Sequence, residues 1–202
     1  MLDIFYRGGP VMYFILLCSI LSLAVALERL FYFIRIRTPY EELLNDVETA
    51  LRQDRPLEAI QIARRYRGPV ANVVAAAITR HGQGEKAIRE AVQKVGQEEV
   101  YQLEKGLAVL EMVGTVSPLL GLLGTVTGLI KSFNVLGALE GIVSPAVLSI
   151  GIAEALITTA AGLMVAIPTL AVYTFFSRLV DRHLVNLNKA TGEIINLMSG
   201  RG

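Results

Sequence analysis

One acidic side chain, Glu154, stands alone in a long apolar stretch of the sequence. Between Glu140 and Arg178 no other residue carries a charge. A charged residue at the centre of a membrane helix costs roughly 2.5–3.5 kcal/mol on insertion scales. Such an acid therefore faces a bundle interior or a wet cavity, or takes up a proton. With hydroxyls following it at Thr158 and Thr159, Glu154 favours a proton or ion path. The alternative is a buried acid that is hydrogen-bonded for structural reasons.

The acid and the two hydroxyls do not share one face of a helix. Glu154 and Thr158 are one turn apart, whereas Thr159 is rotated by ~140° from Glu154 at 3.6 residues per turn. One straight helix therefore cannot direct Glu154 and Thr159 at the same point, and we expect these two side chains to face different neighbours.

Small residues form two stripes with helical spacing. The first consists of Gly114, Pro118, Gly121, Thr125, Gly128 and Ser132, and the second of Ile152, Ala155, Thr159, Gly162 and Ala166. Small residues let membrane helices approach closely, so we expect both stripes to pack and to drive assembly of several copies of the chain. Thr125 and Thr159 lie in the stripes, where a hydroxyl can pass a proton or replace part of an ion's hydration. Pro118 removes a backbone donor and is expected to loosen its helix.

The composition is that of a helical membrane protein. Of the 202 residues, 53% are hydrophobic and 18% charged, and the mean hydropathy is +0.52. Three apolar segments, 11–34, 112–136 and 145–177, are long enough to cross ~30 Å of hydrocarbon. The single cysteine, Cys18, excludes a disulfide within the chain. Because no phosphate loop, nucleophile motif or metal-ligand spacing occurs, we predict no catalytic residues, cofactor, metal or nucleic-acid partner.

Lysine and arginine are concentrated on one side of the predicted spans. They are frequent in residues 35–111 and 178–202, whereas only Arg7 and Lys131 lie on the other side. Basic residues favour the cytoplasmic side of a membrane. We therefore expect a periplasmic N-terminus at 1–10, a cytoplasmic helical region at 35–111, a periplasmic loop at 137–144 and a cytoplasmic C-terminal helix at 178–202.

The cytoplasmic parts are predicted to be helical, so the fold class is an all-α membrane protein with three transmembrane helices. Turn residues separate short helices, two of them at Leu57–Tyr66 and Val70–Arg80. From Glu85 no strong stop occurs until about Leu136, which predicts one helix of ~50 residues. The amphipathic tail is expected to extend the third helix and pack against neighbours. His81 and His183 are both expected to be ordinary surface histidines.

Two segments resemble signatures of the MotA/TolQ/ExbB proton-channel family, most closely its ExbB and TolQ branch. They are Ser117–Gly128 (SPLLGLLGTVTG) in the second span and Gly151–Pro168 in the third. The resemblance implies a ring-forming subunit of the bacterial inner membrane, commonly a homopentamer embedded in membrane lipid. It also implies an ExbD- or TolR-like single-span partner and a TonB- or TolA-like energy transducer. Proton flow would then be coupled to mechanical work on the outer envelope.

The same resemblance assigns candidate ion-pathway residues. The family's pore threonines fall on Thr125 and Thr159, and its third-span glutamate falls on Glu154. Two positions depart from the family pattern, because Thr127 stands where many relatives have a bulky aromatic residue and Thr158 where many have alanine. We expect these additional hydroxyls to alter the hydration of the path or the ion that it uses.

Two other functions are compatible with the same residues. The chain could be a membrane scaffold without ion flux, in which Glu154 only locks helices together. It could also be a self-sufficient channel or carrier, although three spans are few for a carrier and the sequence shows no inverted repeat. A carrier would have to work without a partner, whereas the motor subunit requires one.

Overall fold

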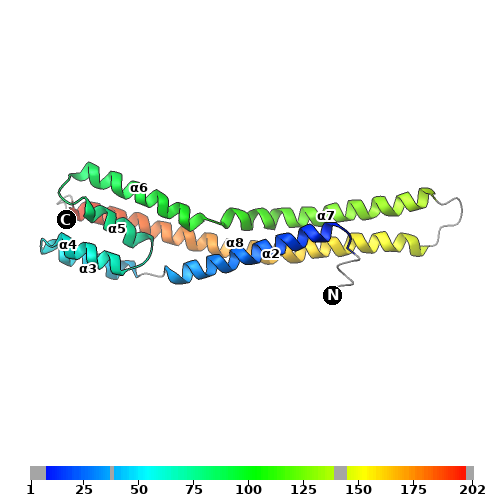
Figure 1. Ribbon diagram of the computed structural model, residues 1–202, viewed down its shortest axis with the longest axis horizontal. Coiled ribbons are helices and arrows are strands. Elements are labelled where there is room, and N and C mark those ends of the chain that lie inside the picture. The colour runs from blue at the N-terminus through cyan, green and yellow to red at the C-terminus, as the bar shows by residue number, and fades with distance from the viewer. Residues whose placement is uncertain (1–7, 37–38, 139–144, 199–202) are drawn as a thin grey trace. The chain divides into compact units, whose positions relative to one another are not determined.

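The computed structural model describes residues 8–36, 39–138 and 145–198, and all regular elements in these ranges are α-helices (Figure 1). In chain order they are α2 (Val11–Arg35), α3 (Tyr40–Arg52), α4 (Pro56–Arg65), α5 (Pro69–Thr79), α6 (Glu85–Glu104), α7 (Leu107–Ala138) and α8 (Pro145–Met198). The all-α prediction is confirmed. Most of the predicted N-terminal segment at 1–10 and of the predicted loop at 137–144 lies outside the described residues.

Three helical stretches are long and apolar enough to cross a membrane, judged by length and composition. They lie in α2, in α6 and α7, and in α8, which agrees with the three predicted spans. Helix α8 has 54 residues, many more than the ~20 that a bilayer requires. Neither Pro118 in α7 nor Pro168 in α8 ends its helix.

The predicted single helix from Glu85 to Leu136 is wrong, because the chain breaks between α6 and α7. Gly106 adopts φ +81°, a left-handed conformation that commonly ends helices at glycine. The Lys105 N–H bonds to Tyr101 O at 3.0 Å, and the Leu110 N–H bonds to Gly106 O at 3.3 Å as the next helix begins. A glycine directly after a charged helical segment was the signal in the sequence.

One compact unit comprises the described parts of Met1–Glu28 and Gly106–Phe175. Within it α7 and α8 run antiparallel, because Gly128 lies against Gly151 while Gly121 lies against Gly162. The first turns of α2 pack beside them in an apolar cluster of Val11, Met12, Ile15, Leu120, Ile157, Ala161 and Val165. This unit therefore holds every residue that sequence analysis placed in the ion path.

The second unit comprises the described parts of Arg29–Lys105 and Phe176–Gly202. Its apolar core joins the short helices to α6 and to the end of α8, through buried residues that include Leu43, Val47, Val73, Val74, Ile88, Val92, Leu187 and Ile194. Helices α4 and α5 begin at Pro56 and Pro69, where proline's missing N–H costs nothing. The tail of α8 thus packs against helices of its own chain.

Two polar side chains of this second unit are shielded from solvent, Arg29 fully and His183 in part. The Arg29 guanidinium donates from Nη1 to Gln102 O at 2.9 Å, one of the last carbonyls of α6, where a cation is favourable. The His183 ring stacks on Phe33 with centroids 5.8 Å apart. His183 is therefore half-buried, which corrects its prediction as an ordinary surface histidine, whereas His81 is exposed.

His183 makes stability depend on pH. Burial lowers the pKa of its imidazole from the ordinary value of 6.5, because desolvation disfavours the charged form. Below about pH 6.5 the imidazole of His183 takes up a proton more readily in the unfolded chain than in the folded chain. The free energy of unfolding therefore falls as pH drops through that value. Above it, this contribution to stability is fully present.

We expect the melting temperature to fall between about pH 7.5 and 5.5 by less in His183→Phe than in the wild type. Phenylalanine keeps the stacking on Phe33 but does not titrate. The exposed His81 provides the control, because His81→Gln should retain the wild-type pH dependence. Thermal unfolding in detergent checks this expectation, and an unchanged pH dependence in His183→Phe would contradict it.

Candidate ion-pathway site in helices α7 and α8

Helices α7 and α8 pack along a seam so close that several of its positions have room only for glycine. A Cβ atom at Gly128 would lie 2.7 Å from Gly151 O, and one at Gly162 would lie 2.5 Å from Ser117 O. Real Cβ atoms essentially never approach other heavy atoms within 3.0 Å. Because these contacts are to backbone atoms, a side chain could fit only if the two helices moved apart. The glycines therefore set the distance between α7 and α8.

The structure places the predicted stripes partly in this seam. Gly114, Gly121, Gly128 and Ser132 of α7 are buried, as are Ala155, Gly162 and Ala166 of α8. Pro118 and Thr125 are half-buried, because Ser117 and Gly124 take the buried positions beside them. On α8 Ile152 is exposed, while Gly151 and Thr158 are buried. Sequence reasoning missed Ser117, Gly124 and Gly151, which lie one residue beside the expected stripes.

The seam lies within one chain, which changes what the stripes imply. They were expected to drive assembly of several copies, but their glycines contact the other helix of the same chain. The stripes therefore account for the pairing of α7 with α8. They do not by themselves support a ring.

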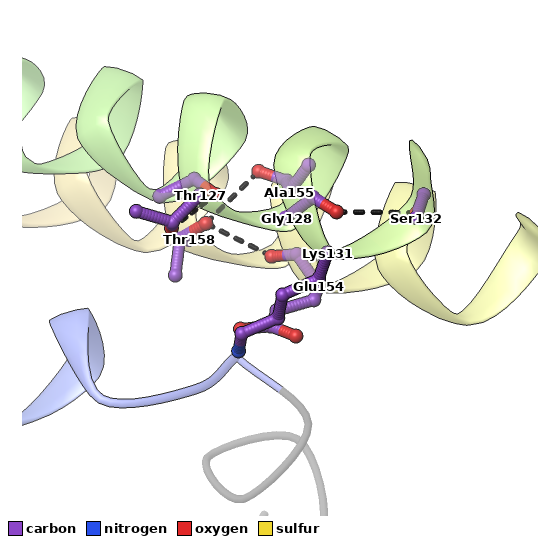
Figure 2. Close-up of polar contacts among 8 residues, drawn as sticks. Thr127, Gly128, Lys131, Ser132, Glu154, Ala155 and Thr158 are labelled. Carbon is purple, nitrogen blue, oxygen red and sulfur yellow. Dashed lines mark hydrogen bonds and ion pairs between the residues drawn. The ribbon is translucent and has the colours of Figure 1, made fainter. Parts of the chain in front are cut away.

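Glu154 has a charged partner in the structure. Its Oε1 lies 2.5 Å from Lys131 Nζ of α7, and Figure 2 shows the two side chains meeting near the start of α2. The Glu154 side chain is 13% exposed and that of Lys131 is 53% exposed. Gly9, at φ +70°, lies so close that a Cβ there would overlap Glu154 Oε1. Sequence reasoning missed Lys131 because the pairing depends on the register between α7 and α8.

The four candidate threonines all donate hydrogen bonds to backbone carbonyls. Thr125 Oγ1 donates to Leu122 O at 2.6 Å and Thr127 Oγ1 to Gly124 O at 3.1 Å, both within α7. Thr158 Oγ1, fully buried, donates to Glu154 O at 2.9 Å or to Ala155 O at 3.0 Å, both within α8. Thr159 Oγ1 crosses to Gly121 O of α7 at 3.1 Å.

The structure therefore separates the predicted pathway residues into two groups. Lys131 and Thr127 are one turn apart on α7, and they lie near Glu154 and Thr158, which are one turn apart on α8 (Figure 2). Thr159 instead bonds to Gly121, as expected from its rotation relative to Glu154. Thr158 thus bonds to the backbone of Glu154, whereas Thr125 and Thr159, the two predicted pore threonines, bond to Leu122 O and Gly121 O. All four hydroxyls donate to backbone carbonyls and not to the Glu154 carboxylate.

These features define a helical membrane protein with three candidate spans, in which a glycine-lined helix pair carries an acid–base pair and several hydroxyls. Residues 65–189 match the family described as the MotA/TolQ/ExbB proton channel family. The chain belongs to this family, and its relatives place it in the ExbB branch.

Three curated relatives illustrate the match. "Biopolymer transport protein exbB1" of Vibrio cholerae is 34% identical over 85% of this chain and 76% of its own length. "Putative biopolymer transport protein ExbB-like 1" of Synechocystis is 38% identical over 93% of this chain and 71% of its own length. "Putative biopolymer transport protein ExbB-like 3" of Synechocystis is 33% identical over 93% of this chain and 90% of its own length. The match includes both helices of the site.

Proposed function

We propose that this chain is the proton-conducting subunit of an ExbB–ExbD or TolQ–TolR type inner-membrane motor, which couples the proton gradient to mechanical work on the outer envelope. The observation that carries the proposal is the family match over residues 65–189, which contain Glu154 and all four threonines. Glu154, Thr125 and Thr159 serve as the ion path, and Thr127 and Thr158 adjust its hydration. Membership of this family and the apolar helices support an inner-membrane location.

The motor requires other subunits, which the family membership suggests. The chain forms a homo-oligomeric ring, a pentamer in our proposal, around an ExbD- or TolR-like single-span protein, and acts through a TonB- or TolA-like transducer. Large apolar side chains on the outside of α2, among them Phe14, Leu17 and Phe31, are exposed in the single chain. They are suited to contact lipid or a neighbouring copy. A clean monomer in native mass measurements across several mild detergents would contradict the ring.

The scaffold alternative has one observation in its favour, because Glu154 is held in an ion pair with Lys131. The two functions differ in what a purified complex does. The chain, tagged and co-expressed with a short single-span protein from the neighbouring reading frame, should retain that protein through purification. If it is a motor subunit, the complex should also take up protons in liposomes. A scaffold would show no uptake, whether or not it retains that protein, and absence of retention would contradict the motor.

The proposed orientation gives a separate prediction. In a Cys18→Ser background, Gly141→Cys should react with a membrane-impermeant thiol reagent added from the periplasmic side, because 137–144 is the proposed external loop. Gln83→Cys should not react, because it lies in the proposed cytoplasmic region, in the exposed turn before α6. Labelling with and without permeabilisation checks the result. The reverse pattern would overturn the orientation.

A further inference from the structure

The cluster of Lys131, Thr127, Glu154 and Thr158 has a lysine that the proposed function leaves unexplained. Lys131 is the only basic residue between Lys105 and Arg178, and its Nζ lies 2.5 Å from Glu154 Oε1. Of the described residues, it is the charged group that the structure pairs with this acid. Gly9 also lies against Glu154 Oε1 and contributes no side chain.

Without Lys131, the Glu154 carboxylate would be a ligand available to a hard cation. Such cations prefer carboxylate, hydroxyl and carbonyl oxygens. Figure 2 shows the Glu154 carboxylate beside Lys131, with Thr127 and Thr158 one helical turn further along α7 and α8. Both hydroxyls donate their protons to backbone carbonyls, so their oxygens are left only as acceptors. An oxygen that can only accept is suited to a cation.

The Lys131 ammonium occupies the position at Glu154 Oε1 that a free cation would take. A sodium ion that approached the carboxylate would meet a like charge at close range, in a partly buried place where repulsion is screened less than in water. A proton does not need a free coordination position at Glu154, because it can bind directly to a carboxylate oxygen or be exchanged with the Lys131 ammonium.

We propose that Lys131 is a specificity-determining residue, whose ammonium acts as a tethered cation that excludes Na⁺ from Glu154 and leaves the proton as the ion of the path. This inference rests on the proposed function, since it assigns Glu154 to an ion path. Sodium binding to the purified chain nevertheless tests it without flux or a partner. Proton uptake therefore tests the motor proposal and sodium binding tests the role of Lys131, so that either can fail without the other.

The experiment compares the melting temperature of the purified chain in NaCl with that in choline chloride of equal concentration. The wild type and Lys131→Arg should melt at the same temperature in both salts. Lys131→Gln should melt higher in NaCl by at least about 2 °C, with a saturable dependence on concentration, because bound Na⁺ stabilises only the folded state. The gain should disappear in Lys131→Gln/Glu154→Gln and shrink in Lys131→Gln/Thr158→Val.

A second measurement covers the case in which Lys131→Gln does not fold. Acetylation of the folded wild type removes the charge of Lys131 after folding, and the same treatment of Lys131→Arg leaves a charge at that position. Sodium-specific stabilisation should then appear in the acetylated wild type and not in acetylated Lys131→Arg. The proposal is overturned if the untreated wild type is already stabilised by Na⁺ over choline, or if neither neutralised form gains that stabilisation.

Discussion

Gly162→Ala should lower the melting temperature of the chain by several degrees, whereas Gly192→Ala, in the same helix, should raise it. A Cβ atom at Gly162 would lie 2.5 Å from Ser117 O and 3.2 Å from the Cα of Gly121, so even one methyl group must push α7 and α8 apart. Overpacking of this kind costs about 1–3 kcal/mol. A change of 1 kcal/mol shifts the melting temperature by roughly 2–4 °C in a chain of this size.

Gly192 provides a matched control because nothing lies within 4 Å of the Cβ that would be added there. In the middle of a helix, alanine is more stable than glycine by roughly 0.5–1 kcal/mol. Thermal unfolding of both variants in one detergent separates helix propensity from seam packing. If Gly162→Ala were as stable as the wild type, the close contact of α7 with α8 would be wrong. If both variants lost stability equally, the effect could not be assigned to the seam.

The double variant Thr125→Val/Thr159→Val should reduce proton uptake to the level of protein-free liposomes while the chain still folds. Valine has nearly the shape of threonine but lacks the hydroxyl, so it cannot accept or donate a proton or replace water around an ion. The structural cost is small, because Thr125 bonds within its own helix and Thr159 loses one bond to Gly121 O. A hydrogen bond of this kind contributes about 0.5–1.5 kcal/mol.

The corresponding serine variant separates the hydroxyl from the shape of the side chain. Thr125→Ser/Thr159→Ser keeps both hydroxyls and loses two methyl groups, so it should retain most of the uptake. Uptake is measured in liposomes that contain the chain and its single-span partner, with circular dichroism and melting temperature as checks on folding. Undiminished uptake in the folded valine variant would remove Thr125 and Thr159 from the path.

The class of fold could be predicted from the sequence because long apolar segments permit few structures in a membrane. The short helices were also predicted within one residue at each end: Pro56–Arg65 for Leu57–Tyr66, and Pro69–Thr79 for Val70–Arg80. Proline at their first positions explains the offset. The break at Gly106 was missed because a single glycine inside a helical pattern is often tolerated. Its left-handed conformation is visible only in the structure.

The polar residues of the candidate site could be predicted from the sequence, but the side chain that pairs with Glu154 could not. Glu154 and its neighbouring hydroxyls stand out in an apolar segment, whatever the fold. Lys131 does not stand out, since it is 23 residues away and was assigned to the external end of a span. Its contact with Glu154 depends on the register of two antiparallel helices, which Gly128 and Gly151 set through backbone contacts. A stripe of small residues in the sequence predicts the contact face of a helix only to within about one residue. Ser117 and Gly124, for example, are buried in place of the predicted Pro118 and Thr125.

Proton uptake by liposomes that contain the chain and its single-span partner, under an imposed pH gradient with sodium absent from both sides, tests the account most directly. The account predicts uptake above that of liposomes with either protein alone, unchanged when equal sodium is added on both sides. Uptake no greater than in protein-free liposomes would contradict a proton path through α7 and α8. Ion movement that followed a sodium gradient and ignored the pH gradient would contradict the proton as the ion of that path.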